Sequence, residues 1–170
     1  AEKIIKEELR FARPSYGWCA EERDEIQGED PTRRWVVDPL DGTTNFLHGI
    51  PHWAISIALE HKQEIVAGII YDPVKDELFS AQKGGGSWLN EQRLRVSNRT
   101  TFQEMLFATG IPFGESDYLE NSLASIGNIM PNCSGIRRNG AASLDLAYVA
   151  AGRFDGFWEQ NLAPWDIASG

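Results

Sequence analysis

The sequence of 170 residues contains only two cysteines and no apolar run that approaches the length of a membrane-spanning helix. Cys19 and Cys133 lie far apart, and neither a Cys-x-x-Cys pair nor a Cys/His spacing typical of zinc sites accompanies them. A disulfide between them is left open, but so few cysteines favour a reduced, cytoplasmic protein. We therefore expect a cytoplasmic location and no membrane partner.

Two common enzyme signatures are also missing. There is no Gly-x-Ser-x-Gly element, which a serine hydrolase of the α/β type would carry. The glycine run at residues 84–86 lacks the Gly-Lys-Ser/Thr order of a nucleotide-binding P-loop. Hydrophobic residues make up 42% of the sequence and charged residues 24%, which is the composition of an ordinary globular protein and argues against disorder.

Basic residues are scarce relative to acidic ones. The sequence has 16 Lys and Arg against 25 Asp and Glu, which gives a formal net charge of −9. The segment 21–41 alone contains eight acidic and three basic residues. Such an excess repels polyanions, so we expect no direct binding of nucleic acid. The acids either form a solvated surface or hold cations.

Hydrophobic periodicity and turn residues predict an α/β fold. Antiparallel strands dominate up to about residue 100, and strands alternate with helices after it. Residues 21–34 read as a polar connection. Because a helix is expected to begin at residue 164, one turn before the last residue, we expect the chain to continue in the native protein. The predicted helices are 1–12, 116–129, 142–151 and 164–168; the predicted strands are 16–20, 35–38, 53–59, 65–71, 77–81, 87–89, 105–109, 134–138 and 154–159.

The most informative segment is residues 35–46. A short apolar strand ends at Asp38, where α/β proteins place their ligands, and Pro39 favours an extended conformation at Asp38. Asp41 follows three residues later, and Gly42 permits a tight turn. Two carboxylates held by a rigid turn can converge on a hard cation such as Mg²⁺ or Ca²⁺.

Other interpretations of this pair remain open. Asp-Gly pairs are common in purely structural turns. A phosphatase of the haloacid dehalogenase type also carries two strand-end aspartates, but two residues apart, whereas Asp38 and Asp41 are three apart. An EF-hand loop that starts at Asp38 is excluded, because its third position would be Leu40 and its twelfth Gly49.

Three motifs resemble those of one enzyme family. Asp-Pro-Leu-Asp-Gly-Thr-Thr-Asn-Phe (residues 38–46) resembles the first signature of the inositol monophosphatase family, and Trp-Asp-Ile-Ala-Ser-Gly (residues 165–170) resembles its second. Trp-Cys-Ala-Glu-Glu (residues 18–22) takes the place of the family's strand that ends in a Glu-Glu pair. The resemblance covers essentially all 170 residues and is closest to the bacterial inositol-1-monophosphatase type.

The resemblance implies a layered α-β-α-β-α sandwich of the type shared by inositol monophosphatase and fructose-1,6-bisphosphatase. Family members carry additional helical sequence before this region and further strands after it. We therefore expect residues 1–170 to form a single phosphatase domain that is incomplete at both ends.

The resemblance also implies an activity: the Mg²⁺-dependent hydrolysis of inositol monophosphate to inositol and phosphate, by direct attack of a metal-activated water. Two to three Mg²⁺ ions, inhibition by lithium and a homodimer belong to the same expectation. The implied metal ligands are Glu21, Asp38, the Leu40 carbonyl, Asp41 and Asp166. The implied catalytic residues are Glu21, Asp41 and Thr43, and the implied substrate-binding residues are Asp41, Gly42, Thr43, Gly140, Ala141, Ala142, Glu159 and Asp166.

The substrate is less tightly specified. Phosphatases of sugar bisphosphates, histidinol phosphate and 3′-phosphonucleotides share these signatures, and some bacterial relatives act as protein partners in transcription. Glu159 and residues 140–142 favour a phosphorylated polyol, and residues 109–113 resemble the bacterial inositol-type branch. Some members carry Thr where Ala141 stands, and the family's upstream acid that contacts the Thr43 position is absent.

The remaining candidates have weaker signals. Arg137 and Arg138 could pair with acids, contribute to a subunit interface or bind phosphate. Glu22 could support the metal ligands or face solvent. The three histidines, His48, His52 and His61, are expected to be surface or packing residues.

Overall fold

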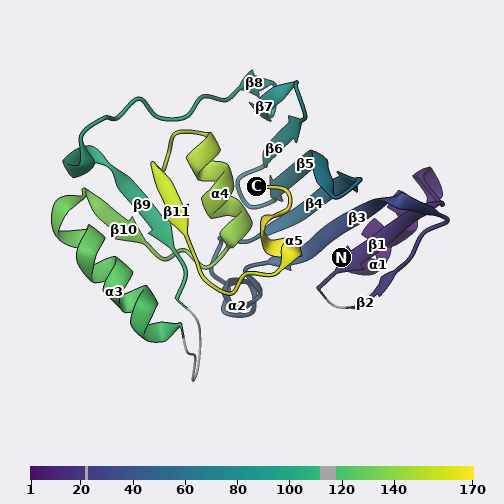
Figure 1. Ribbon diagram of the computed structural model, residues 1–170, viewed down its shortest axis with the longest axis horizontal. Coiled ribbons are helices and arrows are strands. Elements are labelled where there is room, and N and C mark those ends of the chain that lie inside the picture. Colours follow the sequence, from purple (N-terminus) through teal and green to yellow (C-terminus); the bar gives the residue numbers. More distant parts are fainter. Residues whose placement is uncertain (22, 112–117) are drawn as a thin grey trace.

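The computed structural model describes residues 1–21, 23–111 and 118–170, without the side chains of residues 23 and 24. Its elements form five layers (Figure 1): helix α1, an eight-stranded sheet, helices α4 and α5, a three-stranded sheet, and helix α3. The layered α-β-α-β-α prediction is therefore confirmed. Within the described part of the chain, no helix is long and apolar enough to span a membrane.

The eight-stranded sheet is antiparallel except for one pair. Its strand order is β2-β1-β3-β4-β5-β6-β7-β8, and only β1 and β3 run parallel. The β4–β5 link turns at Lys62 and Gln63, both with positive φ, as a tight hairpin requires. The strands are β1 (Tyr16–Ala20), β2 (Arg23–Ile26), β3 (Asp30–Asp41), β4 (Ala54–His61), β5 (Glu64–Asp72), β6 (Glu77–Gln82), β7 (Gly86–Leu89) and β8 (Gln92–Arg93).

One prediction about this sheet was wrong, and one short strand was not anticipated. The region 21–34, expected as a polar connection, contains strand β2 and the first half of β3. β2 is an edge strand, where charged residues are tolerated because only one side must pair, so its sequence carries no apolar alternation. The two-residue strand β8, at the opposite edge, is too short to leave a pattern.

The three-stranded sheet is parallel. β9 (Leu106–Thr109) lies between β10 (Gly135–Arg137) and β11 (Gly156–Trp158). Helix α3 (Leu119–Ile129) connects β9 to β10, and α4 (Ala142–Ala150) connects β10 to β11. Short 3₁₀ turns at Phe102–Glu104 and Met130–Asn132 complete this half. The start of the predicted helix 116–129 and the end of the 109–113 motif lie outside the described residues.

Helix α4 forms the centre of the molecule. Its buried Leu144, Ala147 and Tyr148 pack against Ile70 and Phe79 of the large sheet and against the small sheet on the other side. This explains why α4 is apolar nearly all round, as a helix between two sheets must be. The position of α4 therefore fixes the two sheets relative to each other.

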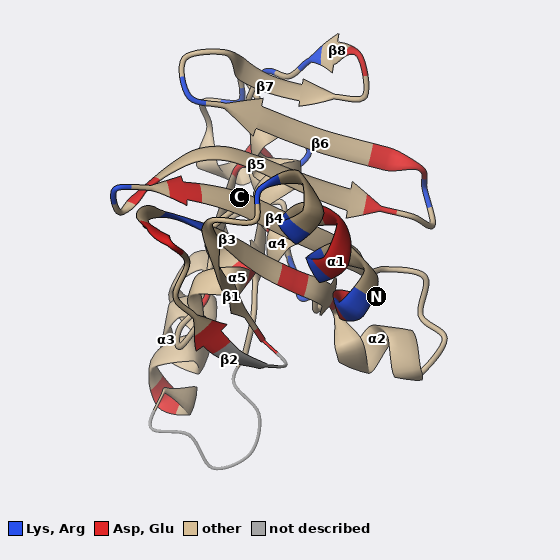
Figure 2. Cartoon of the chain, turned by 90° about the vertical axis from the view of Figure 1, so that its right-hand side faces the viewer, with Lys and Arg blue, Asp and Glu red and all other residues tan. Residues whose placement is uncertain are grey.

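The outer helix α1 (Glu2–Ala12) covers the other face of the large sheet. Ile5 and Leu9 pack onto Trp18 and Val37, and α1 carries both acidic and basic residues, coloured red and blue in Figure 2. On the inner face, the short helix α5 (Pro164–Ile167) packs against β3 and β4. Helix α2 (Thr43–Leu47) directly follows β3.

Candidate active site

A cavity of about 220 Å³ lies where strands of both sheets end. β1 and β3 run parallel, so Glu21 and Asp38 reach the same edge of the large sheet. The three parallel strands of the small sheet lead into Gly110, Arg138 and Glu159, which also line the cavity. Ligands commonly bind at such carboxyl ends of strands. The full lining is Glu21, Asp38, Leu40, Asp41, Gly42, Thr43, Thr44, Asn45, Gly110, Arg138, Gly140, Ala142, Glu159, Leu162 and Asp166.

The segment from Asp38 to Asp41 breaks the regular sheet. Its pairing with β4 shifts register between these two residues, which turns both carboxylates toward the cavity that they line. Asp38, only 2% exposed, accepts a hydrogen bond from the Leu40 N–H at 2.9 Å. Gly42 has a φ of 90°, which only glycine adopts without strain, and it caps α2. The expected rigid turn is therefore confirmed.

Asp41 reaches across to the central helix. Its Oδ2 accepts the N–H of Ser143 at 2.8 Å and the Ser143 hydroxyl at 2.5 Å. Ser143 lies 102 residues further along the chain and is fully buried. Ser143 is not predictable as a partner of Asp41, because no local signal in the sequence links the two residues.

Asp166 enters the cavity from α5. Its Oδ2 accepts the Ala163 N–H at 2.7 Å, and Pro164 occupies the first turn of the helix. The neighbouring Trp165 packs against a buried cluster that includes Val36. Packing of Trp165 thus holds α5, and with it Asp166, against the end of β3.

The acidic side chains in the cavity resist ionisation. Burial is the main reason that the pKa of Asp38 rises to about 8, and the charges of Asp41, Glu21 and Asp166 add to it. Burial also raises the pKa of Asp41 to about 6, although the hydrogen bonds from Ser143 lower it. The pKa of Asp166 is raised by burial as well. The site therefore contains more negative charge than its own hydrogen bonds compensate.

These residues fit a divalent cation in their chemistry. Carboxylate and carbonyl oxygens are the ligands that Mg²⁺ prefers. Within the described ranges, however, no three His, Cys, Asp or Glu side chains are already arranged to hold a metal ion. Asp38, Asp41 and Asp166 instead accept hydrogen bonds from the protein, as carboxylates that repel one another would. A cation would relieve this repulsion.

Thr43 lies at the mouth of the cavity. Its hydroxyl donates to the Leu40 carbonyl at 3.0 Å, which leaves the Thr43 oxygen able to accept a hydrogen bond from a ligand. Glu21, exposed at the end of β1, lines the same cavity. Glu22, the second acid of the pair, lies outside the described residues.

Further predicted substrate contacts come from the start of α4 and from the end of β11. Gly140, with a φ of 85°, and Ala142 line the cavity, whereas Ala141 is buried in the core around α4. Glu159 is half-buried, and burial raises the pKa of its carboxyl group. A Cβ on Gly110 would lie only 1.8 Å from Cδ of Glu159, so the missing side chain of Gly110 provides the space for this carboxylate.

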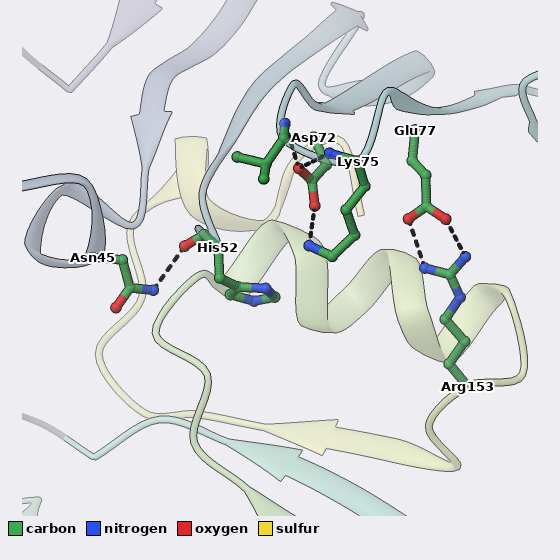
Figure 3. A network of polar contacts seen from close by, with 7 residues as sticks. Asn45, His52, Asp72, Lys75, Glu77 and Arg153 are labelled. Carbon is green, nitrogen blue, oxygen red and sulfur yellow. Dashed lines mark hydrogen bonds and ion pairs between the residues drawn. The ribbon is translucent and has the colours of Figure 1, made fainter. Parts of the chain in front are cut away.

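Asn45 connects helix α2 to the loop before α4. Its side-chain amide donates to the His52 carbonyl and to the Asn139 carbonyl, both at 2.8 Å. The first of these bonds is visible in Figure 3. Asn139 in turn donates to the buried Asp145 of α4 at 2.8 Å. The loop before α4 is thus fixed to the segment that carries Asp41.

One ion pair beyond the cavity connects the segment after α4 to the large sheet (Figure 3). Arg153 binds Glu77 of β6 through both guanidinium arms, whereas Lys75 and the buried Asp72 pair at 2.6 Å within the β5–β6 connection. The Arg153 guanidinium also lies 4.6 Å from the centre of the Tyr148 ring on α4. These contacts restrict movement of the helix that forms one wall of the cavity.

Of the two adjacent arginines, Arg138 lines the cavity and Arg137 does not. Arg138 donates to the Ile111 carbonyl at 3.3 Å, and its charge lowers the pKa of Glu159, partly offsetting burial. His48, His52 and His61, all among the described residues, lie outside the cavity lining, which agrees with their predicted surface or packing roles.

Comparison with known proteins places the chain in a family. All of residues 1–170 match the sequence model of the inositol monophosphatase family. The chain is 55% identical over 170 residues to the inositol-1-monophosphatase of Rhizobium meliloti and 48% identical over 174 residues to the Nus factor SuhB of Pseudomonas aeruginosa. Each alignment covers the whole chain but 64% of the relative, so the chain spans less than two thirds of their length.

The structural comparison agrees. The crystal structure of extragenic suppressor protein suhB from Bartonella henselae matches with a TM-score of 0.96 and 55% identity. The match covers 99% of this chain and 65% of that one. Sequence and fold lead to the same conclusion: the chain belongs to the inositol monophosphatase family.

Proposed function

We propose that this chain contains the catalytic site of a Mg²⁺-dependent phosphatase that hydrolyses inositol monophosphate. The observation that carries the proposal is the convergence of Glu21, Asp38, Asp41 and Asp166, from three separate segments, on one cavity. A phosphate monoester is a dianion, so a purely acidic cavity would reject it without bound cations. Relatives named inositol-1-monophosphatase support the choice of substrate.

The proposed metal ligands are Glu21, Asp38, the Leu40 carbonyl, Asp41 and Asp166. Bound Mg²⁺ would neutralise the phosphate and lower the pKa of a coordinated water. Two to three ions would match the excess of acidic groups. The raised pKa values of Asp38 and Asp41, caused chiefly by burial, support this assignment, because a buried carboxyl group ionises readily only beside a positive charge.

The chain's own groups would orient the reactants. We assign to the Glu21 carboxylate the acceptance of a proton from the attacking water, and to the Thr43 oxygen the orientation of that water. Thr43 suits this role because its own proton is committed to the Leu40 carbonyl. In-line attack by water avoids a covalent phosphoenzyme, so positioning and electrostatics supply most of the rate.

Polyol recognition falls to the residues at the end of β11 and at the start of α4. Glu159 is placed to accept hydrogen bonds from ring hydroxyls, and the backbone near Gly140 and Ala142 lies beside it in the lining. Arg138, in the same lining, is a candidate for contact with the phosphate or with a hydroxyl. Contact between the Ala141 backbone and the substrate remains a prediction.

Phosphate release is the direct test. The intact protein should hydrolyse inositol 1-phosphate faster than fructose 1,6-bisphosphate, histidinol phosphate or a 3′-phosphonucleotide. The activity should require Mg²⁺ and should be inhibited by lithium. Asp41→Asn should abolish it while the protein stays folded. Activity that is unchanged by EDTA would refute the metal mechanism, and a strong preference for one of the other three esters would refute the substrate.

A second function is favoured by one comparison, because a 48% identical relative is named Nus factor SuhB. On this alternative the protein acts as a partner in bacterial transcription. Asp41→Asn would then abolish hydrolysis but leave growth unaffected in a strain that depends on the protein. A homodimer and a cytoplasmic location, expected from the resemblance, also remain predictions; sedimentation velocity would test the first.

A further inference from the structure

Asp41 is held differently from the other carboxylates in the cavity. Asp38 and Asp166 accept backbone N–H groups from within their own short segments. Asp41 accepts the N–H and the hydroxyl of Ser143, both at Oδ2, and also a backbone hydrogen bond from Ala142, so its donors come from the first turn of α4. Asp41 is 8% exposed and Ser143 is fully buried, so water competes little for these bonds.

The same contact completes the start of α4. The residue at the N-cap position is Ala141, which has no side-chain oxygen to accept the first free N–H groups of the helix. The carboxylate of Asp41 supplies that acceptor from another layer of the fold. A negative charge is also favourable at a helix N-terminus. Asp41 is thus both the end of β3 and the cap of the central helix.

The hydroxyl determines how the carboxylate is turned. Without the hydroxyl, Asp41 would keep only the neighbouring backbone N–H groups of Ala142 and Ser143, which approach from one side and allow the carboxylate to turn about its Cβ–Cγ bond. A second donor on the same oxygen, from a different direction, removes this freedom. The side of the carboxylate that points away from Ser143 then faces the cavity that Asp41 lines.

We propose that Ser143 is a positioning residue, whose hydroxyl fixes the orientation in which Asp41 receives a divalent cation. The inference rests on the proposed role of Asp41 as a Mg²⁺ ligand. Groups that hold a metal ligand in place typically account for 10- to 100-fold in metal affinity. Ser143 acts through Asp41 and does not itself touch the ion.

The test is calorimetric titration of the metal-free intact protein with MgCl₂, without substrate. Ser143→Ala should bind Mg²⁺ about 10-fold more weakly than the wild type. Ser143→Thr, which keeps the hydroxyl, should bind within about threefold of it. Ser122→Ala removes a similarly buried serine from α3, away from the cavity lining, and should leave affinity unchanged. Unfolding temperatures of the metal-free variants show that each one is folded.

The outcomes separate the two claims. If the wild type binds Mg²⁺ and Ser143→Ala binds it equally well, the positioning role is refuted while the proposed function stands. If the Ala and Thr variants lose affinity alike, packing rather than the hydroxyl is responsible, and the inference is again refuted. If the wild type itself binds no Mg²⁺, the proposed function fails, and the positioning role fails with it.

Discussion

Replacing Asp38 by asparagine should make the metal-free protein more stable, although it removes a proposed metal ligand. Asp38 is almost fully buried, and burial, followed by the charges of its acidic neighbours, raises its pKa to about 8 from 3.8. The folded state therefore holds a proton that the unfolded state releases above about pH 4. Stability from this group is complete below pH 4 and is lost as the pH rises toward 8.

The magnitude follows from the same shift. Between pH 3.8 and 7, the contribution of Asp38 to the free energy of unfolding falls by about 1.4 kcal/mol per pH unit. The total loss at neutral pH is on the order of 4 kcal/mol. Asparagine cannot ionise, so it avoids this loss, and its carbonyl can still accept the Leu40 N–H. Its new amide group costs about 1–2 kcal/mol if it finds no acceptor. A net gain of about 2 kcal/mol at pH 7 is expected.

Urea unfolding in EDTA at pH 5 and pH 7.5 measures this gain. The free energy of unfolding of the variant should exceed that of the wild type clearly at pH 7.5 and by much less at pH 5. Asp30→Asn is the matched control, because hydrogen bonds from Thr32 and Arg33 lower the pKa of Asp30 to about 2, and its removal should give no gain. An Asp38→Asn protein that is no more stable than wild type at pH 7.5, or equally stabilised at both pH values, would refute the reasoning.

Three further predictions concern neighbouring residues. Gly110→Ala places a methyl group in the space of the Glu159 carboxylate, so KM for inositol 1-phosphate should rise about 10-fold with an unchanged unfolding midpoint; an unchanged KM would contradict it. Gly42→Ala puts a side chain at a φ of 90° and 3.1 Å from the His52 carbonyl, and should cost about 1–2 kcal/mol in urea unfolding, unlike Gly127→Ala, where a Cβ meets open space. Trp165→Ala removes packing under α5 and should cost about 2 kcal/mol, with an unaltered midpoint as the contrary result.

Local chemistry made part of the site predictable. Asp38, Asp41 and Gly42 are adjacent in sequence, and a strand followed by Pro and Gly constrains their geometry before any tertiary contact is known. The central strands were predictable for the same reason, since their apolar alternation reflects burial on one face. Asp166 could be placed only through the family resemblance, because nothing in its local sequence connects it to Asp38.

The remainder depends on contacts between distant segments. Ser143 and Asp41 are 102 residues apart, and Asn45 and Asn139 are 94 apart. A single serine or asparagine has many local roles, so its residue type does not identify such a partner. Gly110 looks like an ordinary loop glycine until Glu159, on a different strand, is placed against it. The edge strand β2 was missed because its charged residues obey no buried pattern.

The long-range bond between Asp41 and Ser143 has a consequence for biosynthesis. Asp41 is synthesised 102 residues before Ser143, and Asp166 is synthesised later still. Until α4 has been made, the carboxylate of Asp41 lacks its orienting donors, and the cavity lacks the lining that the start of α4 supplies. A nascent chain should therefore be unable to form this cavity, and ligand binding there would stabilise only molecules whose synthesis has passed residue 166.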